Sequence, residues 1–333
     1  MMDCAWDLSG QMLPFVKPVL AYSIFALPFS FMLSLLDSLA QQFAWIQNPV
    51  VVARQALAGI SNGMLLFLIA AGLSLIFGVL RIINFAHGAL FMLGGYAGFV
   101  AYQATGNFII AVVAGTLFVG LVGIIFERVI VRFFYARPEE DQILVTFGAG
   151  IVLVELVRLG FGSLSQTVPA PVLVSPIVNL GFTIYPEYRL VAFGIVAVAL
   201  AGLYLLLYRT RLGLVVRAGI EDATMVDMLG INIQRTFMLV FGIGAMAAGF
   251  AGIINAPIIS ITPNVGDDIL IECFVVVVIG GVGSFPGAIL GGIVAGEIMS
   301  LTSMFNPSYS AVMLFAVMAL VLIARPQGLF GTR

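Results

Sequence analysis

The stretch FIIAVVAGTLFVGLVGIIF, residues 108–126, has apolar side chains on every face. A strand of a transmembrane β-barrel would instead alternate apolar and polar positions over about ten residues. The stretch comes close to the ~20 residues that a helix needs to cross the hydrocarbon core of a bilayer. It therefore predicts a membrane-spanning α-helix and argues against a β-barrel.

Similar apolar runs recur along the chain, from Val19 to Ala324. Of the 333 residues, 62% are hydrophobic and only 9% are charged, whereas a soluble domain carries about 25% charged residues. So little charge cannot cover a water-facing surface. We expect an all-α, polytopic transmembrane helical bundle of about eight to ten spans, placed at residues 15–36, 55–80, 85–103, 108–131, 142–161, 190–208, 236–256, 267–282, 286–303 and 309–324.

The first 50 residues are expected to form an N-terminal extension. They contain an extra span at 15–36 and an interfacial segment at 37–49 that carries Trp45. The N-terminus lacks the charged region and small-residue cleavage site of a secretory signal, so we expect this first apolar stretch to be retained. Residues 51–333 then form the main transmembrane domain.

Composition also argues against several classes of function. A net charge of −2 provides no electrostatic footprint for nucleic acid. Cys4 and Cys273 are far apart in the sequence, and we expect both to be packing residues rather than parts of a disulfide framework or metal cluster. The sequence predicts neither a catalytic group nor a set of metal ligands.

The arginines and the lysine predict which side of the membrane each loop faces, because cytoplasmic loops are enriched in these residues. If the C-terminus is cytoplasmic, the predicted spans place all of them on the inner side except Arg54, Arg158 and Arg189. Both termini are then cytoplasmic. The loop at 209–235, which contains four arginines, faces the cytoplasm, and the segment at 163–188 lies outside.

The stretch INFAHGALFMLGGY, residues 83–96, contains the only histidine of the chain, His87, close to Asn84. Asn84 is expected to cap the next helix after a break. A broken helix at membrane depth survives only where it is buried in protein or lines a watery cavity. No nucleophile or carboxylate lies near His87 in the sequence. Two interpretations remain: a bond to a backbone carbonyl that fixes the bend, or a direct role along a solute path.

A short helix is predicted within the cytoplasmic loop at 209–235. Asp222 is expected to cap it and Gly230 to end it. Ala223, Val226 and Leu229 follow at spacings of three and make one apolar edge. About two turns of helix are not stable alone in water. The edge must therefore pack on the inner face of the protein or on a soluble partner, and the spacing leaves both open.

Acidic side chains in or near membrane spans are candidates for contact with a solute or a coupling ion. Three of them stand at the predicted outer mouth of the span at 267–282: Asp267, Asp268 and Glu272. Glu155 and Arg158, three residues apart, are expected to pair. Glu127 is placed at a cytoplasmic helix end, where we expect it to be solvated.

Two stretches rich in small residues are interpreted as packing and turn elements. In FGIGAMAAGFAG, residues 241–252, small residues recur every four positions, which favours close helix packing within the chain over a subunit interface. GGVGSFPG, residues 280–287, lacks the Lys-Ser/Thr ending of a phosphate-binding loop. It predicts a turn between two spans.

Four stretches, in order, resemble those of the branched-chain amino-acid ABC transporter permeases, specifically the subunit that carries an Asn-Phe-Ala-His-Gly motif. They are LSLIFGVLRIINFAHGALFMLGGY, TRLGLVVRAGIEDATMVDMLGI, GGVGSFPGAILGG and RPQGLFG. The resemblance runs from about Gln55 to Gly331, and the first 50 residues depart from it. The fold that it implies is a bundle like that of type II ABC importer permeases.

This resemblance also implies partners and site residues. The chain would sit in a bacterial inner membrane with a second, related permease, two cytoplasmic ATPase subunits and an extracytoplasmic solute-binding protein. It would bind no cofactor itself, because ATP and Mg are used by the ATPases. The translocation path would include Asn84, His87, Gly88 and Gly94. The short cytoplasmic helix would couple to an ATPase through Glu221, Asp222, Ala223, Val226, Leu229 and Gly230.

We therefore expect a non-enzymatic permease subunit that takes up branched-chain or related hydrophobic amino acids. Similar systems carry urea, short amides or aromatic carboxylates, and these remain alternatives. A stand-alone secondary transporter would place paired carboxylates near the bilayer midplane, whereas the acids here are predicted towards the ends of spans. A membrane enzyme would need a nucleophile, a base and an orienting group in one pocket.

Overall fold

A computed structural model of the chain describes residues 48–171, 174, 176–181 and 183–331. The predicted span at 15–36 and the interfacial segment up to residue 47 lie outside the described residues, as does Cys4. The chain divides into two compact units, residues 1–54 and 55–333, and the second contains the helical bundle.

Within the described residues, seven helices are long and apolar enough to cross a membrane, and each overlaps a predicted span. The prediction of a polytopic helical bundle is thereby confirmed. Local signals explain where these helices begin; for example, the Asn107 side chain accepts hydrogen bonds from the amides of Ile109 (2.9 Å) and Ile110 (3.2 Å). The spans are α2 (Pro49–Leu80), α4 (Phe108–Val129), α5 (Glu139–Phe161), α6 (Glu187–Arg209), α9 (Ile233–Asn255), α11 (Phe285–Phe305), and η3 (Pro307–Tyr309) continued by α12 (Ser310–Ala324).

Two further helices occupy the predicted spans at 85–103 and 267–282: α3 (His87–Thr105) and α10 (Val265–Gly280). The 16 residues of α10 rise only about 24 Å, which is less than the ~30 Å hydrocarbon core of a bilayer. The first turns of α3 and α10 touch, because a Cβ atom added at Gly88 would collide with the Gly266 carbonyl oxygen. α10 therefore begins beside the start of α3.

The core is built on close contacts of small residues, and α9 lies at its centre against α3 and α4. Gly244 of α9 faces Ile76 of α2, and Gly252 faces the Phe91 carbonyl of α3. Ala248, between them on the same stripe, is fully buried. The prediction that this stripe packs within the chain is confirmed.

The turn predicted at 280–287 is also confirmed. Gly281 (φ +103°) and Gly283 (φ +79°) adopt backbone conformations that side chains disfavour. The Ser284 hydroxyl then accepts a hydrogen bond from the Gly287 amide (3.1 Å) and starts α11. Cys273, on α10 before this turn, is a fully buried free thiol, as expected for a packing residue.

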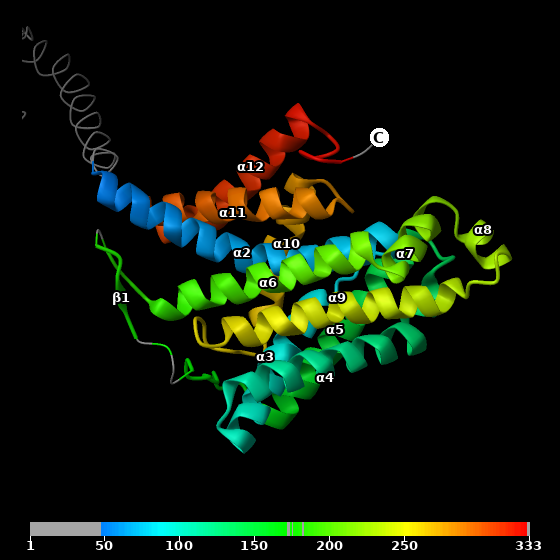
Figure 1. Cartoon of the computed structure of the whole chain (residues 1–333), viewed down its shortest axis with the longest axis horizontal. Helices are drawn as coiled ribbons and strands as arrows, with labels where there is room; N and C mark the ends of the chain where they lie inside the picture. The colour runs from blue at the N-terminus through cyan, green and yellow to red at the C-terminus, as the bar shows by residue number, and fades with distance from the viewer. Residues whose placement is uncertain (1–47, 172–173, 175, 182, 332–333) are drawn as a thin grey trace, which may run out of the picture. The chain divides into compact units, whose positions relative to one another are not determined.

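Short elements lie at the two ends of the long helices (Figure 1). One end carries η2 (Val131–Phe134), α7 (Arg211–Glu221) and α8 (Ala223–Met228). The other end carries the antiparallel pair β1 (Val178–Asn179) and β2 (Ile184–Tyr185), with Val178 opposite Tyr185. At that second end Gln166 and Ile261 also exchange backbone hydrogen bonds of 2.9 and 2.8 Å.

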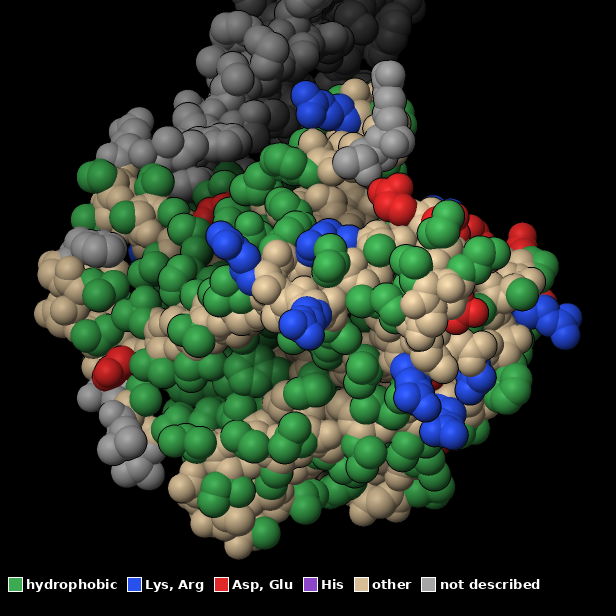
Figure 2. Space-filling view, turned by 45° about the vertical axis from the view of Figure 1, so that its right-hand side comes forward, with side chains coloured by type: hydrophobic (Ala, Val, Ile, Leu, Met, Phe, Trp, Pro, Cys, Tyr) green, Lys and Arg blue, Asp and Glu red, His purple; other side chains and the backbone are tan. Residues whose placement is uncertain are grey.

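Charged and apolar side chains lie on different parts of the surface. Figure 2 shows arginine side chains gathered at the end that carries α7 and α8, with several acidic side chains among them; we call this the basic end. The flanks of the helices expose large apolar side chains; Leu159 and Ile323, for example, are 84% and 86% exposed. Such a band suits contact with lipid, whereas the basic end suits water or lipid headgroups.

Candidate functional site

The chain breaks between α2 and α3 at residues 81–86. Arg81 adopts a left-handed conformation (φ +53°). The side chain of the fully buried Asn84 accepts a hydrogen bond from the Ala86 amide (3.1 Å), and the Asn84 carbonyl accepts one from the His87 amide (3.2 Å). The predicted break is confirmed, but the prediction that Asn84 is the helix cap is wrong. Its side chain closes a turn two residues ahead, so that Ala86 takes the cap position.

This irregular segment lies at membrane depth. The Phe85 amide donates to the Thr146 hydroxyl oxygen (3.2 Å), and that hydroxyl lies 3.3 Å from the Ile83 carbonyl oxygen. Ala86 lies against Gly150. Thr146 and Gly150 are well inside α5, away from both of its ends. The broken backbone is thus enclosed by protein where lipid would otherwise surround it.

His87 is fully buried at the start of α3. Its Nε2 atom lies 3.1 Å from the Ile69 carbonyl oxygen of α2. Because a carbonyl can only accept, Nε2 carries the proton in this arrangement. The bond to a backbone carbonyl, one of the two interpretations of His87, is therefore present, and it ties α3 to α2. Within the described residues, Nδ1 of His87 has no hydrogen-bond partner.

The glycines of this region allow backbones to approach closely. A Cβ atom added at Gly94 would collide with the backbone of Gly249 on α9. At Gly88 it would collide with Gly266 and lie 2.9 Å from the Leu270 Cβ atom. Side chains larger than hydrogen are therefore excluded at both positions by neighbouring backbone.

The three predicted outer-mouth acids lie closer to the break than their sequence positions indicate. Asp267 and Asp268 are exposed in the first turn of α10, and Glu272 is half-buried one turn later. Gly266, which precedes them, touches Gly88. The prediction separates the acids from Asn84 and His87 by the thickness of the membrane. In the structure the start of α10, which carries these acids, lies against the start of α3 next to the break.

The helix predicted around Asp222 is present as α8. The Asp222 side chain accepts a hydrogen bond from the Met225 amide (2.9 Å), and Gly230 follows with φ +81°. The predicted apolar edge is wrong in part. Val226 is only 4% exposed and packs inward, because α8 lies against α7 and α9. The exposed apolar side chains are Met225 (55%), Met228 (76%) and Leu229 (71%), with Leu229 just past the end of the helix.

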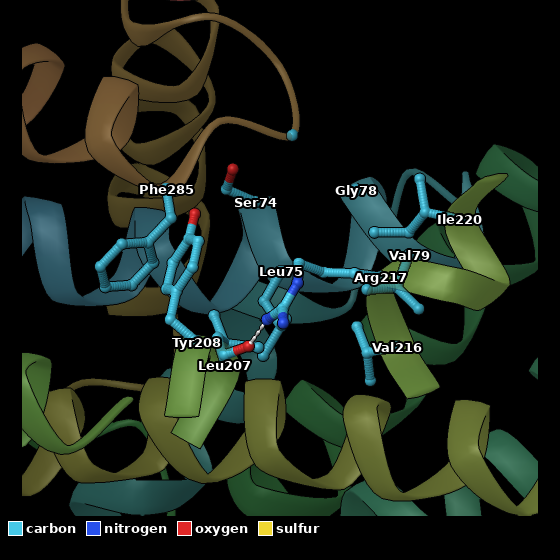
Figure 3. Close-up of a pocket in the computed structure, with 11 residues that line it drawn as sticks. Ser74, Leu75, Gly78, Val79, Leu207, Tyr208, Val216, Arg217, Ile220 and Phe285 are labelled. Carbon is cyan, nitrogen blue, oxygen red and sulfur yellow. Dashed lines mark hydrogen bonds between the residues drawn. The ribbon is translucent and has the colours of Figure 1, made fainter. Parts of the chain in front are cut away.

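Sequence reasoning missed α7, which joins α8 to the bundle. The Thr210 hydroxyl accepts a hydrogen bond from the Gly213 amide (3.2 Å) and caps this helix, a signal that the sequence does contain. Figure 3 shows Arg217 of α7 reaching back to the Leu207 carbonyl of α6. Its guanidinium carbon also lies 5.5 Å from the centre of the Tyr208 ring. Together these contacts fix the angle between α6 and α7.

A cavity of about 80 Å³ lies beside the junction of α6 and α7 (Figure 3). Ser74 of α2 and Phe285 of α11 are among the residues that line it. The buried Ser74 hydroxyl has no hydrogen-bond partner within the described residues. This volume suits a few water molecules, each of which occupies about 30 Å³ in the liquid.

The prediction that Glu127 is solvated at a helix end is wrong. It is 1% exposed rather than solvated, and its Oε1 atom accepts a hydrogen bond from the Tyr135 hydroxyl (2.5 Å). The chain turns back through η2, which places Tyr135 over the carboxylate and against Phe237 of α9. Burial and the neighbouring carboxylate raise the pKa of the Tyr135 hydroxyl.

The predicted ion pair between Glu155 and Arg158 is confirmed. Arg158 also donates a hydrogen bond to the Asn264 side chain (2.8 Å).

Among the described residues, no three His, Cys, Asp or Glu side chains are grouped so that they could hold a metal ion. The described features are instead a broken helix enclosed at membrane depth and a short helix with exposed apolar side chains at the basic end. They define a multi-pass α-helical membrane protein of the permease type.

Comparison with known proteins supports the assignment to the permeases. Residues 55–322 match the family described as branched-chain amino acid transport system / permease component. The chain belongs to this family. The chain is therefore a multi-pass membrane protein that serves as the permease component of a transport system, rather than an enzyme.

Relatives with curated names are similar over most of their length. The high-affinity branched-chain amino acid transport system permease protein BraD of Pseudomonas aeruginosa is 30% identical over 292 residues, which is 84% of this chain and 95% of BraD. LivH of Escherichia coli (strain K12), with the same description, is 30% identical over 293 residues, with the same coverage. A probable LivH of Methanocaldococcus jannaschii is 28% identical over 80% of this chain and 89% of its own length.

Among solved structures, PsaBC from Streptococcus pneumoniae in complex with Fab aligns with 87% of this chain and 97% of that chain. The sequence identity is 11% and the TM-score is 0.45.

Proposed function

We propose that this chain is the permease subunit of an ATP-driven importer for branched-chain amino acids. The observation that carries the proposal is the family match over residues 55–322, because it covers the broken helix and the α7–α8 loop together. The curated relatives that match are named as permeases for branched-chain amino acids, which favours these solutes over urea, short amides or aromatic carboxylates.

The translocation path in this proposal passes the break between α2 and α3, beside Asn84, His87, Gly88 and Gly94. Irregular backbone within a bundle lines the solute sites of many transporters, because its polar groups then face the solute rather than lipid. Two long helices hold the segment after the break in place. His87 is hydrogen-bonded to the Ile69 carbonyl of α2, and Gly94 of α3 packs on Gly249 of α9.

Coupling in this proposal runs through the loop at 209–235 of the permease domain at 51–333. Met225, Met228 and Leu229 of α8 are exposed and would enter a groove on an ATPase subunit. Its movement would reach the bundle through α7, which Arg217 fixes to the end of α6. Val226 and Ala223 would hold α8 in place from the inside.

The remaining partners are a second, related permease, a second ATPase subunit and an extracytoplasmic solute-binding protein. The basic end would face the cytoplasm, following the positive-inside rule. Both termini would then be cytoplasmic, with residues 1–50 as an added N-terminal extension. ATP and Mg would be bound by the ATPases and no cofactor by this chain.

Reconstitution tests the proposal. We expect proteoliposomes that hold this chain with its second permease, the ATPases and the solute-binding protein to accumulate labelled leucine, isoleucine and valine when ATP is present. Liposomes that contain this chain alone should accumulate none. Uptake by the lone chain, driven by an ion gradient at the rate of the full complex, would show instead that it is a secondary transporter.

We expect His87→Ala to lower leucine uptake by about tenfold, while the complex still assembles. The substitution removes one buried hydrogen bond, which contributes about 1 kcal/mol, and leaves a void beside the path. His87→Gln places an amide donor near the position of Nε2 and should restore part of the uptake. Uptake per assembled complex and yield on size-exclusion chromatography measure the two effects. Equal loss of both would indicate that His87 acts only in folding.

A further inference from the structure

An apolar cavity of about 180 Å³ lies beside the break, between α2, α10 and α12, and it opens to the surface at Ile271 and Phe315, which are 51% and 43% exposed. The Phe85 ring forms part of its wall, and its centre is 6.4 Å from that of Phe274 on α10. Ile271 of α10 and Phe315 of α12 line it as well. The polar side chain among the lining residues is Asn84.

The volume of this cavity can be compared with the size of an amino-acid side chain. An apolar cavity of about 150 Å³ in another protein stays dry and takes up benzene, which has six carbon atoms. A cavity of about 180 Å³ therefore accommodates the three or four carbons of a valine, leucine or isoleucine side chain. The apolar walls would exclude a charged side chain, because a buried charge without a partner is costly.

Asn84 supplies a polar group at one edge of the cavity. Its Oδ1 atom accepts from the Ala86 amide (3.1 Å), which fixes the orientation of the side-chain amide. Within the described residues its Nδ2 atom has no hydrogen-bond partner, although the residue is 0% exposed. A buried donor left unpaired is destabilising, so a ligand oxygen that accepts from it would be favoured there. The first turn of α3 begins three residues later and adds the positive end of its helix dipole.

The wall formed by α10 carries a negative charge near the same cavity. Asp267 precedes Leu270 and Ile271 by three and four residues, and both of these line the cavity. Residues at these spacings share one helix face. Asp268 stands three residues before Ile271 and so lies beside the same face, but it has that spacing to only one of these two lining residues. An amino acid held in the cavity would then have a donor for its carboxylate at Asn84, and an acceptor for its ammonium group on the helix face of Asp267.

We propose that this cavity binds the apolar side chain of the amino acid in transit, with the carboxylate at Asn84 and the ammonium group towards Asp267. The inference rests on the proposed function and extends it. The permease then discriminates by side-chain size at a site of its own, in addition to the selection made by the solute-binding protein.

Filling and enlarging the cavity test this proposal in the reconstituted complex. Ile271→Phe fills it from a position that is 51% exposed, so that the larger ring can be accommodated without straining the core. One methylene in a hydrophobic pocket changes specificity by about 10–200-fold. We expect the ratio of maximal uptake rates for leucine and valine to fall about tenfold. The concentration giving half-maximal uptake, which the solute-binding protein sets, should not change.

Phe315→Ala enlarges the same cavity and should shift that ratio in the opposite direction, by about threefold in favour of leucine. Val100→Phe is the matched control, because Val100 is 47% exposed and lines a separate apolar cavity of about 390 Å³ between α3, α4 and α5. It should leave the ratio unchanged.

The ratio of maximal uptake rates for leucine and valine tests the proposal. A ratio that stays within about twofold of the wild-type value in Ile271→Phe and Phe315→Ala would overturn the proposal, and so would an equal shift in Val100→Phe. If Ile271→Phe does not assemble, the ratio in Phe315→Ala decides alone. Wild-type complexes that transport neither leucine nor valine would contradict the proposed function itself, which is a separate outcome.

Discussion

Replacing Met228 and Leu229 together with aspartate is expected to abolish ATP-driven uptake, with a loss of at least about 100-fold. Both side chains are more than two-thirds exposed at the basic end of the bundle. A charge buried without a partner at an interface costs several kcal/mol, and each 1.4 kcal/mol is a factor of ten in affinity. Solute-stimulated ATP hydrolysis and co-purification of the ATPase subunits measure the effect.

The control for this prediction is a pair of conservative exchanges at the same positions. Met228→Leu with Leu229→Met keeps the apolar surface, and it should keep most of the uptake. The aspartate variant should insert into the membrane as well as the wild type, because neither position is buried. Normal ATPase stimulation in the aspartate variant would remove α8 from the coupling interface.

Gly94→Val is expected to prevent formation of a stable bundle. A Cβ atom at this position would collide with the carbonyl and Cα of Gly249, which are backbone atoms and cannot rotate away. Overpacking costs about 1–3 kcal/mol where side chains can adjust, and the cost is higher against backbone. We expect the yield of monodisperse protein in detergent to fall about tenfold or more, and its melting temperature to drop.

Gly148→Val is the matched control for this substitution. Gly148 lies within a membrane helix, α5, and a Cβ atom added there meets nothing within 4 Å. The variant should fold and transport as the wild type does. Equal damage from both substitutions would mean that valine harms these helices through its backbone preference rather than through the contact with Gly249.

Local features of the fold were predictable because neighbouring residues decide them. Apolar runs set the positions of the helices, as in α4, where the run at 108–126 lies wholly inside Phe108–Val129. The Asp222 cap and the Glu155–Arg158 pair each depend on groups within three residues of one another. Such signals act within one turn of helix, so the sequence displays them directly.

The candidate site was only partly predictable. Asn84 and His87 mark the break, but nothing in their spacing indicates that His87 bonds to Ile69 or that Gly88 touches Gly266. Glu127 is buried because the chain returns through η2 and brings Tyr135 back over it. The cavity beside Asn84 has walls from three helices that are distant in the sequence.

The sequence by itself determined that this chain is a helical membrane protein of many spans, where most of those spans lie, and to which family it belongs. These follow from composition, from apolar length and from motifs. Only the tertiary structure decided which face of α8 is free, that α10 begins beside α3, and which residues surround Asn84. The physical reason is that hydrophobicity drives a segment into the membrane whatever its neighbours are. The facing of each side chain depends on which helices pack against it, and in this chain glycine contacts between distant segments set that packing.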